Sequence, residues 1–262
     1  MVVSADPTAA GSGGANAFAA SLCFDHPMAT EQPVGETIDW HPARRPARTP
    51  LEGRYVVLRP LDAVGDAESL YEESHPPLAD PGLWTYLPSG PYGDAAQLRD
   101  GLALAERSED PLTFTIVPRG VEHPAGVASY MRIKPEHGVI EVGGIWFGAS
   151  LRRSAAASEA IYLFAAHAFD ELGYRRFEWK CDALNQASRR AAERFGFRFE
   201  GIFRRHMVVK GRNRDTAWYA ITDEEWPAIR DAFRAWLARE NFDEAGRQRR
   251  ALGELIAEAR LR

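Results

Sequence analysis

Apolar positions recur with two different periods after residue 50, and these periods predict an alternation of strands and helices. Between Ile161 and Leu172 the apolar residues follow intervals of three and four, the pattern of a helix with one buried face. Gly173 comes next and is placed to end this helix in a left-handed conformation. In Phe177–Cys181 apolar and charged residues alternate, which predicts a strand with one buried face. Cys181 is therefore expected to be a small core residue and not a nucleophile.

The same periods assign the rest of this region. Strands are expected at Arg54–Arg59, Leu112–Val117, Gly126–Ile133, Gly138–Gly148, Phe197–Val209 and Thr216–Ile221, with a turn at Gly211–Arg214 between the last two. Helices are expected at Asp62–Tyr71, over residues 94–108, at Gln186–Phe195 between an Asn185 cap and Gly196, and at Trp226–Leu237. Strands and helices in this order predict an α/β (α+β) fold, a mixed sheet with helices on its faces.

The pattern also divides the chain into three regions. Residues 1–50 are rich in Gly, Ala, Ser and Pro without a sustained period, so a mobile leader is expected, although Trp40, Arg44 and Arg45 could pack on the domain surface. The folded domain is expected over residues 51–222. Residues 223–262 contain one amphipathic helix and a tail of mixed charge, which predicts a helical C-terminal extension.

Composition and net charge limit the kinds of partner and the cellular location to be expected. With 262 residues, 45% of them hydrophobic, the chain is long enough to bury a core of its own. A net charge of -5 gives no reason to expect a nucleic acid or an anionic membrane as partner. Two cysteines are too few for a disulfide framework, and the chain has neither an apolar run of about 20 residues nor a signal sequence. A soluble, cytoplasmic protein is expected.

One stretch combines the features of a phosphate site. Gly143 and Gly144 interrupt a strand, which indicates a bulge or the close approach of a ligand. The turn Leu151–Ala157 then leads through small residues into a helix, whose N-terminal N–H groups suit a phosphate. Small residues at a helix start are equally typical of plain packing. The seven histidines lack metal-ligand spacing and no CxxC motif occurs, so no metal is expected.

Three longer motifs carry a family resemblance. The segments RRSAAASEA, NQASRRAAERFGF and VVKGRNRDTAWYAI resemble the GNAT family of acyl-CoA N-acetyltransferases, and within it the ribosomal-protein-acetylase-like (RimJ/RimL type) branch. The resemblance extends from Leu51 to Ile221. It implies a GNAT-type twisted mixed β-sheet, splayed at a bulged central strand, with helices on both faces. It also implies acetyl-CoA (coenzyme A) as cosubstrate, bound in the splay without a metal.

The resemblance assigns the cofactor-binding residues. Ile145, Trp146 and Phe147 would offer backbone groups to the pantetheine arm, and Asn185 would contact that arm or simply cap a helix. The pyrophosphate would bind the main-chain N–H groups of the turn and helix start, formed by Arg152, Arg153, Ser154, Ala155, Ala156, Ala157 and Ser158. The family's pattern has glycine where this chain has Ala155, a methyl group that disfavours positive φ, so the geometry of the loop or the tightness of binding is in question. Arg152 or Arg153 could compensate through charge-assisted hydrogen bonds.

The reaction requires further groups. An amine with a pKa of about 10 must lose a proton before it attacks a thioester, and the leaving thiolate, pKa about 8.5, benefits from a hydrogen bond. Glu141 precedes the double glycine, and we expect it to act as the base through a water molecule; a glutamate in a surface salt bridge is the structural alternative. By resemblance Ser188 lies near the thioester sulfur and is expected to donate to the thiolate. Tyr130 and His206 are second candidates for these roles.

An acceptor pocket is expected from three separate segments. They are the loop His75–Tyr92, which would be a lid or an anchor, the strand at Tyr130 and Arg132, and the last hairpin. The candidate substrate-binding residues are Trp84, Tyr86, Tyr130, His206, Arg212 and Trp218, with Lys210, Arg214 and Asp215 beside them. So many cations could bind a carboxylate or phosphate, although the hairpin is also typical of a solvated turn.

The expected function is transfer of an acetyl group from acetyl-CoA to a primary amine by direct attack in a ternary complex. The acceptor is an amine-bearing small molecule or a protein N-terminus. Two alternatives remain: transfer of a larger acyl group such as succinyl, and a non-catalytic acyl-CoA-binding protein that kept the fold. Exposed Trp218, Trp226 and Trp236 could form a homodimer interface, or they complete the core.

Overall fold

The computed structural model describes residues 32–121 and 123–261. The chain divides into two units, the first ending at Trp40 and the second beginning at His41. Residues 32–40 contain no helix or strand, and most of the expected leader lies outside the described residues. Within the second unit, the backbone N–H of Ala43 donates to the carbonyl of Pro135 (3.0 Å) and that of Arg44 to the carbonyl of Leu172 (2.9 Å). This part of the predicted leader therefore lies along the domain.

The second unit is built on one sheet of eight strands. These are β1 (Leu51–Glu52), β2 (Val56–Pro60), β3 (Leu112–Pro118), β4 (Gly126–Lys134), β5 (Val139–Phe147), β6 (Arg176–Asp182), β7 (Arg198–Val209) and β8 (Arg212–Thr222). Their order in the sheet is β1-β2-β3-β4-β5-β6-β8-β7. Only β5 and β6 pair in parallel; all other neighbours are antiparallel. The mixed sheet predicted from the sequence is confirmed.

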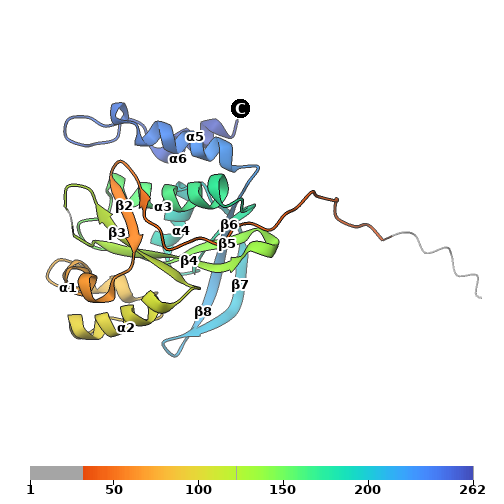
Figure 1. Cartoon of the computed structure of the whole chain (residues 1–262). Helices are drawn as coiled ribbons and strands as arrows, with labels where there is room; N and C mark the ends of the chain where they lie inside the picture. Colours follow the sequence, from red (N-terminus) through yellow and green to blue (C-terminus); the bar gives the residue numbers. More distant parts are fainter. Residues whose placement is uncertain (1–31, 122, 262) are drawn as a thin grey trace, which may run out of the picture. The chain divides into compact units, whose positions relative to one another are not determined.

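Helices cover both faces of this sheet (Figure 1). On one face lie α1 (Ala63–Ser74) and α2 (Ala95–Arg107), and on the other lie α3 (Ala155–Ala166), α4 (Gln186–Arg194), α5 (Trp226–Leu237) and α6 (Leu252–Ala259). Short 3-10 turns occur at η1 (Pro81–Trp84), η2 (Pro135–His137) and η4 (Arg239–Asn241), and η3 (His167–Glu171) is a π-helix. No helix in the described part of the chain has the length and apolar character needed to cross a bilayer.

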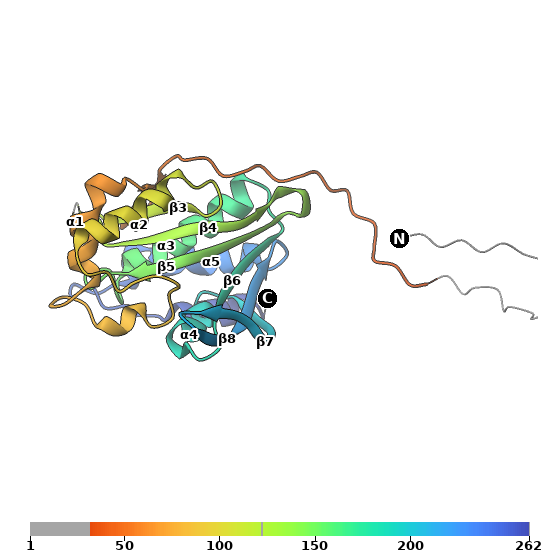
Figure 2. The same cartoon turned by 90° about the horizontal axis from the view of Figure 1, so that it is seen from below.

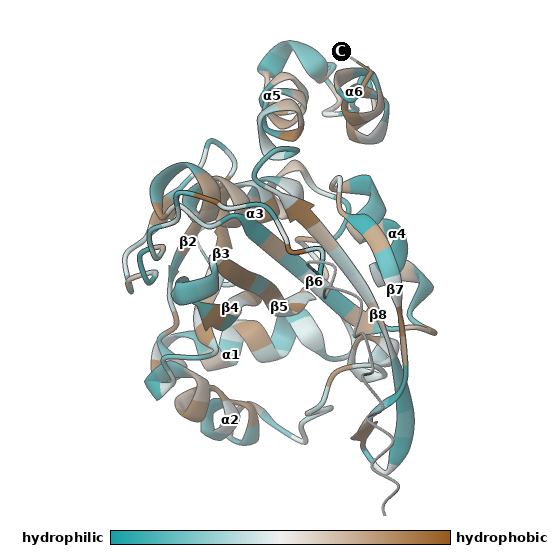
Figure 3. Ribbon diagram, turned by 90° about the vertical axis from the view of Figure 1, so that its right-hand side faces the viewer, coloured by the Kyte–Doolittle hydropathy of each residue, from teal (hydrophilic) through white to brown (hydrophobic). Residues whose placement is uncertain are grey.

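Two hydrophobic cores follow from this layering. The larger core lies under α3, where Tyr130, Phe164 and Phe177 are fully buried, and the strands there are the most apolar part of the ribbon (Figure 3). The smaller core lies between the sheet and the α1–α2 pair and contains Trp84 and Trp146. Because successive side chains of a strand point to opposite faces, one sheet supplies both cores.

The structure corrects the predicted end of one helix and the predicted position of the hairpin turn. The predicted helix to Leu172 stops being α-helical at Ala166 and continues as the π-turn η3, and Gly173 then takes φ 81° as expected of a terminating glycine. The hairpin turn is Lys210–Gly211, not Gly211–Arg214. Both residues have positive φ (49° and 73°), which is the twist that a two-residue hairpin requires. Arg212 and Arg214 therefore belong to β8.

The C-terminal helices complete the larger core. Trp226 and Trp236 are only 2% and 3% exposed, and the indole N–H of Trp226 donates to Asp170 Oδ1 (2.7 Å). The α6 residues Leu252 and Ile256 pack into the same cluster. Neither tryptophan therefore offers the exposed surface that a dimer interface built on them would need.

Candidate functional site

The central strands separate at the predicted double glycine. β5 and β6 are paired from Val139 to Val142 on β5 and from Arg176 to Trp179 on β6, and not beyond. The β4–β5 register shifts between the pairs Ser129–Gly143 and Val127–Trp146, which is a β-bulge on β5, and Gly144 takes φ 60° there. Figure 2 shows β5 and β6 diverging from this point. The edge of β5 over residues 143–147 consequently has backbone groups without a β6 partner, where Ile145, Trp146 and Phe147 were predicted to bind the pantetheine arm.

The predicted phosphate-binding turn leads directly into α3. Ser154 caps the helix, because its Oγ accepts the N–H of Ala157 (3.1 Å) and donates to the carbonyl of Leu151 (2.7 Å). The left-handed residue of the turn is Arg153 (φ 60°), whereas Ala155 is the first residue of α3 and has no positive φ. The alanine thus costs no backbone strain at this position.

The remaining members of this turn show how it is held. Arg152 and Arg153 are exposed, while Ala156, Ala157 and Ser158 are buried. The Ser158 Oγ accepts from Arg194 of α4 (3.0 Å), so this side chain joins two helices. A residue that the sequence did not single out, Glu73 at the end of α1, is buried and accepts the N–H of Ser150 (2.8 Å). Glu73 fixes the start of the turn.

Asn185 and Ser188 lie at the start of α4, on the β6 side of the separation. The Oδ1 of Asn185 accepts the N–H of Ser188 (3.1 Å), so Asn185 is the helix cap that its sequence position predicts. The Oγ of Ser188 accepts the indole N–H of Trp179 (3.0 Å). Burial raises the pKa of the Cys181 thiol, and a hydrogen bond from Ser188 opposes this shift. The Ser188 hydroxyl therefore contacts both the Trp179 indole and the Cys181 thiol.

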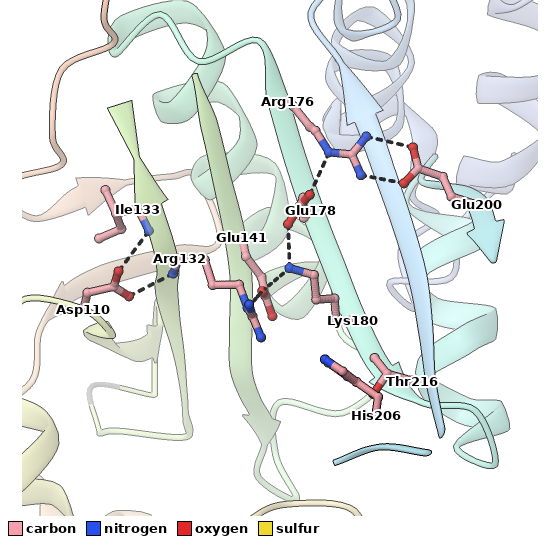
Figure 4. A network of polar contacts seen from close by, with 10 residues as sticks. All are labelled: Asp110, Arg132, Ile133, Glu141, Arg176, Glu178, Lys180, Glu200, His206 and Thr216. Carbon is pink, nitrogen blue, oxygen red and sulfur yellow. Dashed lines mark hydrogen bonds and ion pairs between the residues drawn. The ribbon is translucent and has the colours of Figure 1, made fainter. Parts of the chain in front are cut away.

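A ladder of charged side chains crosses β4, β5, β6 and β7 on the sheet face opposite α3 (Figure 4). Lys180 lies at its centre: its Nζ is 2.8 Å from Glu141 Oε2 and 2.6 Å from Glu178 Oε2. All three side chains are less than 9% exposed. Arg176 extends the ladder from Glu178 (2.7 Å) to Glu200 (2.5 Å). The lysine is thus held between two buried carboxylates.

Glu141 is bound from two sides. Besides Lys180, the Nε of Arg132 lies 3.1 Å from Glu141 Oε2. Arg132 occupies a second bulge, on β4, with φ 49°, and Asp110 stabilises this bulge by accepting the N–H groups of Arg132 (2.8 Å) and Ile133 (3.0 Å). Burial raises the pKa of Glu141, while Lys180 and Arg132 act in the opposite direction.

The predicted acceptor residues fall into two groups. Trp84 is 3% exposed and donates its indole N–H to Ser74 O (3.0 Å), and Tyr130 is fully buried and donates its hydroxyl to Phe164 O (2.7 Å). Both are core residues, so neither has a surface with which to contact an acceptor. The loop His75–Tyr92 is accordingly anchored at Trp84. Tyr86 is half-buried, and its hydroxyl lies 3.4 Å from Leu184 O, across the separation of the strands.

The second group lies on the β7–β8 hairpin. His206 is half-buried, and its Nδ1 lies 2.9 Å from Thr216 Oγ1. The ring of Trp218 is beneath the Nζ of Lys180, 3.9 Å from the ring centre. Lys210, at the hairpin tip, donates to Trp84 O (2.8 Å), which joins the hairpin to the anchored loop. Arg212 is exposed at the hairpin end, away from these contacts.

Sequence reasoning missed Lys180, Asp110 and Glu73. Lys180 was assigned to the polar face of its strand, and the signal that could have found it is the alternation of Arg176, Glu178 and Lys180, opposite charges on one strand face. Asp110 and Glu73 contact residues far along the chain, so no local pattern marks them. Within the described residues no three His, Cys, Asp or Glu side chains are grouped to hold a metal ion.

Comparison with known proteins agrees with this geometry. Residues 56–198 match the family model described as "Acetyltransferase (GNAT) domain". A GCN5-related N-acetyltransferase from Brucella melitensis, known as a crystal structure, is 49% identical; the match covers 84% of this chain and 99% of that one with a TM-score of 0.81. The Bacillus subtilis (strain 168) "Uncharacterized N-acetyltransferase YnaD" is 24% identical over 163 residues, 62% of this chain and 90% of that protein.

A protein of known acceptor shares the fold. The structure titled "RimL- Ribosomal L7/L12 alpha-N-protein acetyltransferase" is 21% identical, covers 66% of this chain and 93% of that one, and has a TM-score of 0.56. At this identity the similarity concerns the fold alone. The family match spans more than half of the chain. The chain therefore belongs to the GNAT acetyltransferase family and is an acyl-CoA-dependent N-acetyltransferase.

Proposed function

We propose that the protein transfers an acetyl group from acetyl-CoA to a primary amine by direct attack in a ternary complex. The observation that carries the proposal is the free edge of β5, which leads from buried Glu141 toward the N-terminus of α3. Acetyl-CoA has two features that match it: a pantetheine arm whose amides can extend a strand, and a pyrophosphate suited to a helix N-terminus. The groups that would bind these features are the backbone of Ile145–Phe147 and the turn Arg152–Ser158.

The transfer removes a proton from the amine and releases CoA as a thiolate. The amine nitrogen attacks the thioester carbon, a C–N bond forms, and the C–S bond breaks. Glu141 accepts the proton of the amine through a water molecule, and its burial supports this role because burial raises the pKa of Glu141 toward the range of a useful base. Ser188 donates a hydrogen bond to the leaving sulfur. Backbone N–H groups of β5 would stabilise the oxyanion.

We further propose that the enzyme belongs near the RimJ/RimL-type branch. The motifs of α3, α4 and the β7–β8 hairpin support this placement, and the fold shared with the ribosomal L7/L12 acetyltransferase is compatible with it. The acceptor is accordingly an amine-bearing small molecule or a protein N-terminus.

Calorimetric titration tests the first step. The protein is titrated with acetyl-CoA, CoA, succinyl-CoA and NAD, and saturable binding of acetyl-CoA with no heat from NAD is expected. Release of free CoA and the mass of the acylated product are then followed with a panel of amines and N-terminal peptides. Absence of acyl-CoA binding, or hydrolysis of the thioester without any acylated amine, would contradict the proposal.

A further inference from the structure

We propose that the reacting complex contains a carboxylate that binds on β8, between Arg214, Trp218 and His206. The carboxylate belongs either to the amine acceptor, as in an amino acid or a peptide C-terminus, or to a dicarboxylic acyl group such as succinyl. This inference rests on the acyl transfer proposed above and names the chemistry of one of its two partners.

The first observation is an unpaired guanidinium. Arg214 is half-buried, its Nε is closed to solvent, and no hydrogen-bond partner reaches that atom. Among the described residues Arg214 has no ion pair either. Glu141 and Glu178 bind Lys180, Asp215 accepts from Arg205 N (2.7 Å), and Asp182, opposite Thr216 in the β6–β8 ladder, accepts from Leu184 N (2.9 Å). A guanidinium Nε that is closed to solvent and has no acceptor is unusual, because its desolvation is not offset. An anionic ligand would supply the missing acceptor.

The second observation is an unpaired indole on the same face of the same strand. The Nε1 of Trp218 is also closed to solvent and has no acceptor. Arg214, Thr216 and Trp218 alternate along β8, so their side chains share one face of the sheet. An indole N–H can only donate, and buried donors are normally satisfied. Two donors on the same strand face, one on each side of Thr216, therefore lack an acceptor.

The third observation is the sign of the local charge. Burial lowers the pKa of His206, and Arg132, Arg214 and Lys180 lower it further; the charges that act on this imidazole are all positive. His206 is held on Thr216, between the two unsatisfied donors. These cations and the unpaired Nε of Arg214 match a ligand with a single negative charge. A carboxylate has that charge and two coplanar oxygens for the guanidinium edge.

The position of these donors connects them to the chemistry. Trp218 lies opposite Lys180 in the β6–β8 ladder, and Lys180 binds Glu141, the proposed base. A carboxylate at Trp218 would therefore be separated from Glu141 only by the side chain of Lys180. Phe203 is 52% exposed and its ring lies 4.5 Å from that of Trp218. Rotation of this exposed ring would uncover the ring of Trp218.

The kinetic test compares partners that differ by one carboxylate. Acetyl transfer to lysine and tyrosine is measured against cadaverine and tyramine, with the amino acid amides as controls for the pKa of the amine. In parallel, succinyl-CoA is compared with acetyl-CoA on the same amine. In the wild-type enzyme the carboxylate-bearing partner of at least one arm is expected to have a kcat/KM higher by about tenfold or more, and the arm that responds identifies the source.

Two variants locate the effect. Arg214→Gln is expected to remove most of this preference, because it lowers kcat/KM far more for the carboxylate-bearing partner than for the carboxylate-free one. Arg204→Gln is the matched control, since it removes the same charge from an exposed position of the hairpin, and it should keep the preference. Because each value is a ratio measured in one protein sample, partial unfolding of a variant does not change it. Equal losses on both kinds of partner in Arg214→Gln, or no preference in the wild type, would overturn the inference.

A binding measurement separates this inference from the proposed function. N-acetyllysine and N-acetyltyrosine are titrated into the CoA-bound protein beside N-acetylcadaverine and N-acetyltyramine, and succinyl-CoA beside acetyl-CoA. Tighter binding of a carboxylate form, lost in Arg214→Gln, supports the site even if no amine is acylated. Turnover of amines without discrimination in either assay keeps the proposed function and rejects the site.

Discussion

At the scale of single residues, the protonation of Glu141 is set by two opposing effects. Burial raises the pKa of Glu141, and Lys180, at 2.8 Å, together with Arg132, at 3.1 Å, lowers it. A carboxylate accepts a proton only when it is ionised. Activity that depends on Glu141 is therefore expected to fall as the pH drops through this pKa, and the neighbouring cations decide where that happens.

Replacing the base itself gives the first prediction. Glu141→Gln is expected to lower kcat about 100-fold near neutral pH, with a smaller loss at high pH, where the amine is already deprotonated. The dissociation constant of acetyl-CoA should stay nearly unchanged. Glu178→Gln is the control, because it removes the other carboxylate bound to Lys180 and should cost much less. A loss in Glu141→Gln that is the same at every pH would indicate a structural role.

Replacing Lys180 tests the positioning of Glu141. In Lys180→Met the pKa of Glu141 rises because a cation that lowers it is removed, so the acidic limb of the kcat/KM profile moves to higher pH. Lys180→Arg keeps the charge and should return the limb toward its original position. A purely structural lysine would lower activity without moving the limb.

Ser188 is tested through the hydrogen bond it already makes. Ser188→Ala removes the acceptor of the Trp179 N–H, which is expected to cost about 1 kcal/mol of unfolding free energy. If its hydroxyl also donates to the leaving thiolate, kcat falls about tenfold in addition. This loss is largest for thioester substrates whose leaving thiol is least acidic. Ser188→Thr should retain activity. Thermal denaturation and kcat are measured on the same samples; a stability loss with unchanged kcat would leave Ser188 as a structural residue only.

At the scale of elements, the turn before α3 contains one of the strained backbone positions. Arg153 has φ 60°, so Arg153→Gly removes about 1 kcal/mol of strain and should be neutral or stabilising despite the added flexibility of glycine. Ala155→Gly lies two residues on, at the first position of α3, and should destabilise by about 0.5 kcal/mol. Urea denaturation of the two variants should give shifts of opposite sign. If Ala155→Gly were the stabilising one, the strained position would have been misplaced.

At the scale of the whole molecule, α6 is part of the main core although it lies beyond the family match. Leu252 is fully buried in that core, and Leu261, a few residues on, is 88% exposed. Leu252→Ala is expected to lower the unfolding free energy by about 2–4 kcal/mol in a single transition. Leu261→Ala should change it by less than about 0.5 kcal/mol. Two separate transitions would mean that the extension unfolds independently.

Local patterns predicted most of the elements. The apolar spacing in α3, the cap Asn185, and the double glycine of β5 lie where the sequence places them, because each depends on neighbours within a few residues. The predicted hairpin turn began one residue too late. Lys210 adopts a left-handed conformation, which is uncommon for lysine and so could not be predicted from the residue type.

The sequence by itself therefore determined the strand and helix order, the family and the bulge that separates β5 from β6. Only the tertiary structure decided that Tyr130 and Trp84 are buried, that Lys180 pairs with Glu141, and that Arg214 and Trp218 lack partners. The physical reason is that burial and ion pairing depend on which distant strands become neighbours. Sheet pairing joins Arg132, Glu141 and Lys180 from three strands, and no period along the chain encodes that contact.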